Sequence, residues 1–194
     1  MAIRNTEDRR VRKTKKQLRM ALTTLLLKKD LDAITVRDVA ELADVNRGTF
    51  YAHYKDVEEL LHQLENELMN ELIALGEKYK DKLNNESAFA YLTEIFALAG
   101  ENSDIVYALN ATTVDMAFQM NLHRELQQQY LFPFLEKLEL QGVYAELTAA
   151  YMTAGLIAMT VRWIEGGKKE SPEELARLCG KLVSRGVGAV KNGL

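Results

Sequence analysis

The stretch ITVRDVAELADVNRGTFYAHYKD, residues 34–56, determines how the rest of the chain is interpreted. Thr35 is followed three positions later by Asp38, which matches a capping box, where each side chain satisfies a backbone N–H of the other residue. This pattern predicts a helix over residues 36–43. Asp44 and Val45 then supply a turn, and Asn46 is a favoured N-cap for a second short helix over residues 47–53.

Two helices of this length, joined by a turn of about three residues, have the geometry of a helix-turn-helix. Val39, Ala40 and Val45 fit its interior, and Ala40 is small where the two helices would cross. Phe50 and Tyr54 are at helical spacing and are expected in the core more than at a contact. In such a motif the N-terminal part of the second helix enters the major groove of DNA.

The solvent face of the second helix carries side chains suited to DNA. Arg47 can hydrogen-bond O6 and N7 of guanine, and the Thr49 methyl can contact a thymine methyl. Tyr51, His53 and Lys55 suit phosphates, which hold the register of the protein on the duplex; His53 could instead be a packed histidine. The predicted DNA-contact set is Thr35, Arg37, Asn46, Arg47, Gly48, Thr49, Tyr51, His53, Tyr54 and Lys55.

The longer stretch ITVRDVAELADVNRGTFYAHYKDVEELL, residues 34–61, resembles the DNA-binding segment of the TetR family of bacterial transcriptional regulators. The stretch AGLIAMTVRWIEGGKKESPEELARL, residues 154–178, resembles the last two helices of a TetR branch common in Firmicutes. Asp44 stands where the family often has glycine, and aspartate tolerates the left-handed conformation that such a turn needs. Val57 stands where the family often has a phosphate-binding lysine, which leaves Lys55 and the helix N-terminus as anion donors. The resemblance implies a homodimeric repressor that leaves a palindromic operator when an effector binds.

Composition and charge agree with a helical, DNA-binding chain. Hydrophobic residues make up 47% of the 194 residues, and only two prolines and eleven glycines occur, which favours an all-α fold. The net charge is −3, but residues 1–55 carry 13 Lys and Arg against 7 Asp and Glu, whereas the remainder carries 12 against 21. A basic head on an acidic body favours a polyanion partner at one end. A solvated basic tail is the alternative explanation.

The predicted fold class is all-α, with a three-helix helix-turn-helix domain followed by a larger helical effector-binding and dimerisation domain. We expect about nine helices, the predicted domains are 1–55 and 56–194, and a long helix over 56–79 joins them. Residues 1–8 are expected to form a disordered arm, and Pro133 is expected to kink or break the chain near Leu131. The predicted helical ranges are 8–29, 36–43, 47–53, 56–79, 88–100, 103–110, 114–130, 131–140, 144–165 and 172–187.

A dimer is expected because a single short recognition helix makes too few contacts for specificity. The last two predicted helices combine small residues, which allow close approach, with large apolar ones, and the resemblance implies that they pair across the dimer as a four-helix bundle. An ordinary intrachain core is the alternative. The predicted interface residues are Ala150, Ala154, Gly155, Ala158, Val161, Leu175, Leu178 and Leu182.

The effector pocket is less readable, and the effector itself could be a small molecule or a protein. Polar groups at partly apolar positions, together with methionines that could line a cavity, give the candidates. Plain core packing explains the same pattern. The predicted effector-binding residues are Tyr107, Asn110, Thr113, Met116, Gln119, His123, Tyr151 and Met152.

Enzyme functions find no support in the sequence. The three histidines and Cys179 lack the spacing of a zinc site, so no metal and no cofactor is expected. The single cysteine and the absence of a signal-peptide pattern favour a reducing cytoplasm. The apolar stretch 147–164 is expected to be a helix buried on several sides rather than a membrane span. The alternative function is a helical sensor or protein-interaction module that has lost DNA binding.

Overall fold

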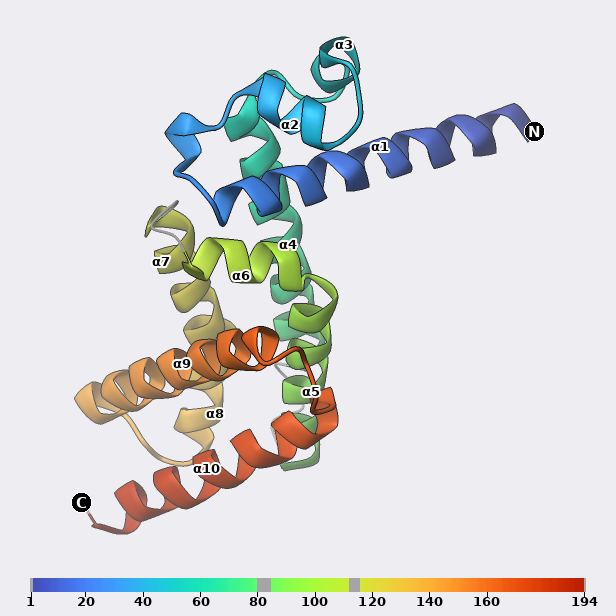
Figure 1. The fold of residues 1–194 in the computed structure, drawn as a ribbon. Coiled ribbons are helices and arrows are strands. Elements are labelled where there is room, and N and C mark those ends of the chain that lie inside the picture. Colours follow the sequence, from blue (N-terminus) through green and yellow to red (C-terminus); the bar gives the residue numbers. More distant parts are fainter. Residues whose placement is uncertain (1, 80–84, 112–115, 194) are drawn as a thin grey trace. The chain divides into compact units, whose positions relative to one another are not determined.

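The computed structural model describes residues 2–79, 85–111 and 116–193, and every regular element in them is helical (Figure 1). If α7, η2 and α8 are counted as one continuous run, these residues hold nine α-helices, as the sequence predicts. The chain forms two compact units: unit 1 comprises Met1–Glu67 and Asp104–Val114, and unit 2 comprises Leu68–Ser103 and Asp115–Leu194. The domains 1–55 and 56–194 remain a prediction about function.

Unit 1 contains the predicted helix-turn-helix. Its elements are α1 (Ala2–Leu26), the 3-10 turn η1 (Leu31–Ala33), α2 (Val36–Leu42), α3 (Arg47–Tyr51), the first part of α4 (Val57–Tyr79), and α6 (Ser103–Ala111) from Asp104 onward. Fully buried side chains from five of these helices form its core, and because they recur every three or four residues, each helix buries one face. They include Leu18, Leu22, Val39, Phe50, Leu60, Leu61 and Ile105.

The first helix differs from its prediction at its start. α1 begins at Ala2 rather than at residue 8, so the expected disordered arm is helical. Residues 2–8 contain neither glycine nor proline, and nothing in their sequence stops a helix from extending toward the N-terminus. α2 and α3 end one and two residues earlier than predicted, a normal uncertainty for helix ends.

Unit 2 consists of the second part of α4 with α5 (Asn85–Glu101), α7 (Met116–Leu126), the π-helical segment η2 (Gln127–Leu131), α8 (Phe132–Lys137), α9 (Gly142–Glu165) and α10 (Pro172–Gly193). The loop between α9 and α10 is fastened to α5: Lys168 Nζ donates to the Gly100 carbonyl oxygen and to Ser103 Oγ, both at 2.9 Å. Trp163 packs edge-on against Phe96, with ring centroids 6.3 Å apart.

The predicted disturbance at Pro133 takes the form of a π-helical segment rather than a break. Proline lacks the N–H that an α-helix needs, and the wider π-turns of η2 directly precede it. The same segment brings Gln129 close to α4, where a Cβ atom on Gly76 would lie 2.8 Å from Gln129 Cβ. Gly76 therefore allows these two helices to approach each other.

The prediction that the apolar helix near the C-terminus is buried on several sides is wrong. α9 is the helix in the described residues that is long and apolar enough to cross a membrane by length and composition, and only 22% of its apolar window is buried. Leu147 and Tyr151 on this helix are 64% and 81% exposed. Such a face in a folded chain is typical of a surface that a partner covers.

Candidate functional site

The start of α2 is fixed by local hydrogen bonds. Asp38 N donates to Thr35 Oγ1 at 3.2 Å and Thr35 N donates to Asp38 Oδ2 at 2.9 Å, which confirms the capping box. Lys29 Nζ lies 2.8 Å from the same carboxylate. The hydrogen bond from Lys29, followed by those from Thr35, holds the pKa of Asp38 well below its ordinary value. Thr35 and Arg37 are thereby held at the exposed N-terminal end of α2.

The turn before α3 has the geometry that the sequence predicts. Asp44 has a φ of +54°, the left-handed conformation that glycine often supplies in such turns. Asn46 caps α3, because Thr49 N donates to Asn46 Oδ1 at 2.7 Å and Thr49 Oγ1 donates to the same atom at 3.1 Å. With its hydroxyl occupied by the cap, Thr49 has its methyl group left for a base, in agreement with the predicted contact to thymine.

The two faces of α3 separate core from surface. Phe50 is fully buried, whereas Arg47, Gly48 and Ala52 are exposed and Tyr51 is 58% exposed. A Cβ atom on Gly48 would lie 3.1 Å from Asn46 Oδ1, so a side chain there presses on the cap. This face is therefore a short, largely uncharged helix surface with one guanidinium and one phenol available to a partner.

The structure corrects one member of the predicted DNA-contact set. Tyr54 is 3% exposed and packs against Phe50 with ring centroids 5.8 Å apart, so its ring belongs to the core of unit 1. Burial, followed by the charges of Glu67 and Glu59, raises the pKa of Tyr54 to about 12. Lys15 Nζ lies 5.9 Å from the Tyr54 ring centroid. His53, beside it, is only half-buried.

The cations near α3 are held loosely. Arg37 Nε lies 2.7 Å from Glu41 Oε1, but both side chains are 65% exposed, and such a surface pair contributes little. Lys55 is 86% exposed and lies 3.4 Å from Asp56. Either cation can exchange its carboxylate partner for a phosphate at small cost. The N-terminus of α4 is less available than expected, because Glu59 N already donates to Asp56 Oδ1 at 2.8 Å.

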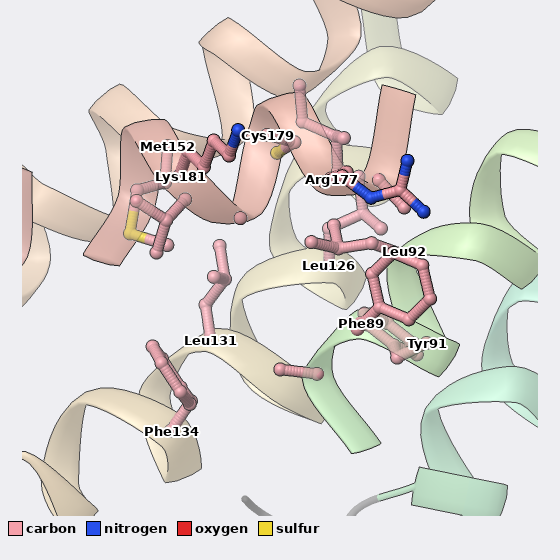
Figure 2. Close-up of a pocket in the computed structure, with 15 residues that line it drawn as sticks. Phe89, Tyr91, Leu92, Leu126, Leu131, Phe134, Met152, Arg177, Cys179 and Lys181 are labelled. Atoms are coloured by element: carbon pink, nitrogen blue, oxygen red, sulfur yellow. The ribbon is translucent and has the colours of Figure 1, made fainter. Parts of the chain in front are cut away.

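A cavity of about 330 Å³ lies inside unit 2 (Figure 2). Its walls come from α5, from the run α7–η2–α8, from α9 and from α10. Phe89, Tyr91, Leu92, Leu131, Phe134, Arg177 and Lys181 line it together with Ala88, Leu126, Met152, Leu156, Ala176, Cys179, Gly180 and Val183.

The predicted effector-binding residues are scattered over the structure. Met152 lines the cavity, and Tyr151, its neighbour on α9, is exposed. Tyr107 and Asn110 belong to α6, where Asn110 Nδ2 donates to the Val106 carbonyl oxygen at 2.8 Å. Three of the others, Met116, Gln119 and His123, lie on α7, and Thr113 lies outside the described residues.

The sequence reasoning missed most of the cavity. Its walls come from helices separated by up to about ninety residues, so periodicity within one helix does not show which faces meet. One local signal was present: Arg177 and Lys181 are spaced by one turn and flank the small residues Ala176 and Gly180.

A groove of about 790 Å³ separates the exposed faces of α9 and α10. Of the predicted interface residues, Leu175 is corrected: it is 6% exposed and packs with Trp163 in the core of its own chain. Val161 is half-buried. The other six are exposed, namely Ala150, Ala154, Gly155, Ala158, Leu178 and Leu182.

Comparison with known proteins assigns both parts of the chain. Residues 21–64 match the family described as bacterial regulatory proteins, tetR family, and residues 86–185 match a transcriptional regulator C-terminal region. The chain is 30% identical over 178 residues to YxbF of Bacillus subtilis (strain 168), an uncharacterized HTH-type transcriptional regulator; this covers 88% of the chain and 44% of that protein. The chain thus spans less than half the length of that relative.

Two solved structures illustrate the shared fold. A TetR transcriptional regulator from Streptococcus agalactiae 2603V is 27% identical, with a TM-score of 0.56 over 92% of this chain and 97% of that one. FadR from Bacillus subtilis, solved in complex with stearoyl-CoA, is 15% identical, with a TM-score of 0.63 over 87% of this chain and 96% of that one. The second likeness concerns the fold alone.

Proposed function

Because this chain belongs to the TetR family of DNA-binding transcriptional regulators, we propose that it is a homodimeric repressor, released from a palindromic operator by an effector. The family is non-enzymatic and consists of soluble regulators, which is consistent with a cytoplasmic protein. The observation that carries the proposal is the face of α3, with Arg47 and Tyr51 presented to solvent beside a capped and glycine-free turn.

The contacts of α3 divide into two kinds. Arg47, in the first turn of the recognition helix, is proposed to bind a guanine edge, and the Thr49 methyl a thymine methyl. Tyr51, His53, Lys55, Thr35 and Arg37 are proposed to contact phosphates, which fix the register. The loosely held pairs of Arg37 and Lys55 support this division, because their cations can turn to the backbone of DNA without losing a buried partner.

The dimer is proposed to form through α9 and α10. Exposed large apolar side chains on these helices, among them Leu147, Tyr151 and Leu182, surround exposed small residues. A Cβ atom on Gly155 would meet no other atom within 4 Å, so a second chain has room to approach there. Burying this face would remove apolar surface from water at roughly 25 cal/mol per Å².

The effector is proposed to bind in the cavity of unit 2. A cavity of about 330 Å³ with mostly apolar walls falls within the range of small-molecule sites. The complex of the related FadR with stearoyl-CoA supports a small-molecule effector for a chain of this fold. Met152 is the predicted effector residue that would take part.

The proposal is tested by a mobility-shift series with DNA fragments flanking the gene, run at about 50 and 200 mM salt. With roughly 6–10 phosphate contacts, log K should fall with log salt at a slope of about −0.9 per contact. A shift that disappears at the higher salt for all but one palindromic fragment is the expected result. Folded protein that shifts no fragment even at the lower salt would favour a sensor or interaction module without DNA binding.

A further inference from the structure

The cavity in unit 2 is an apolar chamber where three hydrophobic clusters meet. Tyr91 and Leu126 belong to one cluster, Ala176 and Cys179 to a second, and Leu131, Phe134 and Met152 to a third. Each cluster is packed internally, yet about 330 Å³ stays open between them. An unfilled apolar cavity forgoes packing contacts, so a ligand that fills it stabilises the folded chain.

Two cations mark one side of this chamber. Arg177 and Lys181 are exposed, are spaced by one turn of α10, and line the cavity together. Figure 2 shows Arg177 on the side of Phe89 and Leu92, and Lys181 on the side of Met152 and Cys179. Among the described residues that line the cavity there is no aspartate or glutamate.

The nearest carboxylate along α10 does not neutralise this pair. Glu173 lies one turn before Arg177, and its pKa is lowered mainly by a backbone hydrogen bond and by Ser171, with the charge of Arg177 as the smallest contribution. The cavity therefore combines apolar walls with net positive charge at its rim. That combination suits a ligand with one apolar and one anionic end.

We propose that this cavity binds an unbranched apolar chain that ends in one anionic head group, a carboxylate or a phosphate, held by Arg177 and Lys181. The chain lies among the three clusters, and the head group stays at the rim, where water and both cations reach it. That such a molecule acts as the effector rests on the proposed function; its binding to the cavity does not.

The binding is tested on the full chain by calorimetry with octanoate, decanoate and dodecanoate below their micelle-forming concentrations. Each methylene buried in the cavity should tighten binding roughly fourfold until the cavity is full. Decanol and decyltrimethylammonium have matched chains with a neutral and a cationic head, and both should bind at least tenfold more weakly than decanoate. Decyl phosphate decides which anion is preferred. Equal affinity for decanol and decanoate would overturn the role of the cations.

Variants separate the head-group site from the chain site. Arg177→Gln and Lys181→Gln should each weaken decanoate by about tenfold and leave decanol unchanged. Lys169→Gln is the matched control, because Lys169 is exposed in unit 2 and does not line the cavity. If Lys169→Gln weakens decanoate as much as the other two variants do, a specific site at the rim is excluded.

Gly180→Phe tests the chamber itself. A Cβ atom on Gly180 meets no other atom within 4 Å, and Gly180 lines this cavity, so the added ring should fill the space without a clash at Cβ. Replacing a helical glycine also favours the helix. The variant should stay folded and lose measurable affinity for decanoate and decanol alike. Unchanged binding by folded Gly180→Phe would place the chain elsewhere.

Operator release is measured separately, by adding decanoate to the protein–DNA complex. Binding of decanoate without any operator complex would contradict the proposed function and leave the ligand class supported. A firm operator complex, together with no calorimetric signal from any of the anionic ligands, would contradict the ligand class and leave the proposed function standing. The two failures are thus distinguishable.

Discussion

Arg19 holds Asp104 through two hydrogen bonds, from Nε and Nη2 to the two carboxylate oxygens, each 2.9 Å long. The pair joins α1 to α6 within unit 1, across 85 positions of sequence. Both side chains are partly shielded, at 21% and 33% exposure. A forked, partly buried pair of this kind is stronger than an ordinary surface ion pair and fixes the angle at which the two helices meet.

Asp104→Asn should destabilise unit 1 in a pH-dependent manner. Burial raises the pKa of Asp104, but the hydrogen bonds and charge of Arg19 outweigh it, and the net shift is downward from 3.8. A carboxyl with a lowered folded-state pKa stabilises the fold above its ordinary pKa and loses that effect as the pH falls through the folded-state value. Urea unfolding should show a difference of about 1–2 kcal/mol at pH 7 that shrinks below about pH 4.

A double-mutant cycle with Arg19→Met and Asp104→Asn isolates the pair. The coupling free energy should be about 1 kcal/mol or more at pH 7, because both changes remove the same two hydrogen bonds. Arg37→Met with Glu41→Gln is the exposed control pair, for which the coupling should be within a few tenths of a kcal/mol. Equal coupling in the two cycles would mean that burial adds nothing to the Arg19–Asp104 pair.

Asp44→Gly should be neutral or stabilise the chain by up to about 1 kcal/mol. Asp44 has a φ of +54°, which glycine adopts without the steric cost that a side chain carries. Asp44→Val should cost about 1–2 kcal/mol for the same reason. Glu41→Gly, only three residues earlier but inside α2, should destabilise by about 1 kcal/mol. Thermal unfolding of the three variants would contradict the turn geometry if Asp44→Gly behaved like Glu41→Gly.

Arg47→Ala and Tyr51→Phe should weaken DNA binding in different ways. Loss of the Arg47 guanidinium should cost about 1–3 kcal/mol and relax the preference at one base pair of each half-site. Loss of the Tyr51 hydroxyl should weaken all sequences alike, as expected of a phosphate contact. Selection of binding sites from a random library by both variants measures the difference. Full sequence preference in Arg47→Ala would remove this residue from the base contacts.

Gly155→Arg and Ala158→Glu should yield monomers. Both positions are exposed on α9 beside the apolar groove, and a charge buried there without a partner is costly. Lys169→Glu, in the loop between α9 and α10, is the control and should stay dimeric. Sedimentation velocity at micromolar concentration distinguishes the species. If both groove variants sediment as dimers, the interface lies on another face.

The sequence predicted the features that depend on neighbouring residues. The capping box of Thr35, the cap by Asn46 and the left-handed Asp44 are all confirmed, because each requires side chains only a few positions apart. The Arg19–Asp104 pair could not be predicted, since nothing in either local sequence indicates its partner 85 positions away.

Faces of helices were predicted less well than the helices themselves. Leu175 and Leu178 are both apolar positions of α10, yet the first is 6% exposed and the second 49%, because only the packing of α10 on its neighbours decides which position is covered. Tyr54 shows the same limit, since its phenol suits a phosphate but its position on the chain turns the ring into the core. The cavity required four separate helical segments to meet.

Footprinting of the purified protein on its palindromic operator tests the central claim most directly. Two chains that each place α3 in a major groove should protect two half-sites related by the palindrome, with centres one helical turn of about 10–10.5 base pairs, or a whole multiple of it, apart. Arg47→Ala should lose both protected half-sites together. Protection of a single half-site, or of half-sites at a spacing that is not a whole number of turns, would contradict a symmetric dimer that reads DNA through α3.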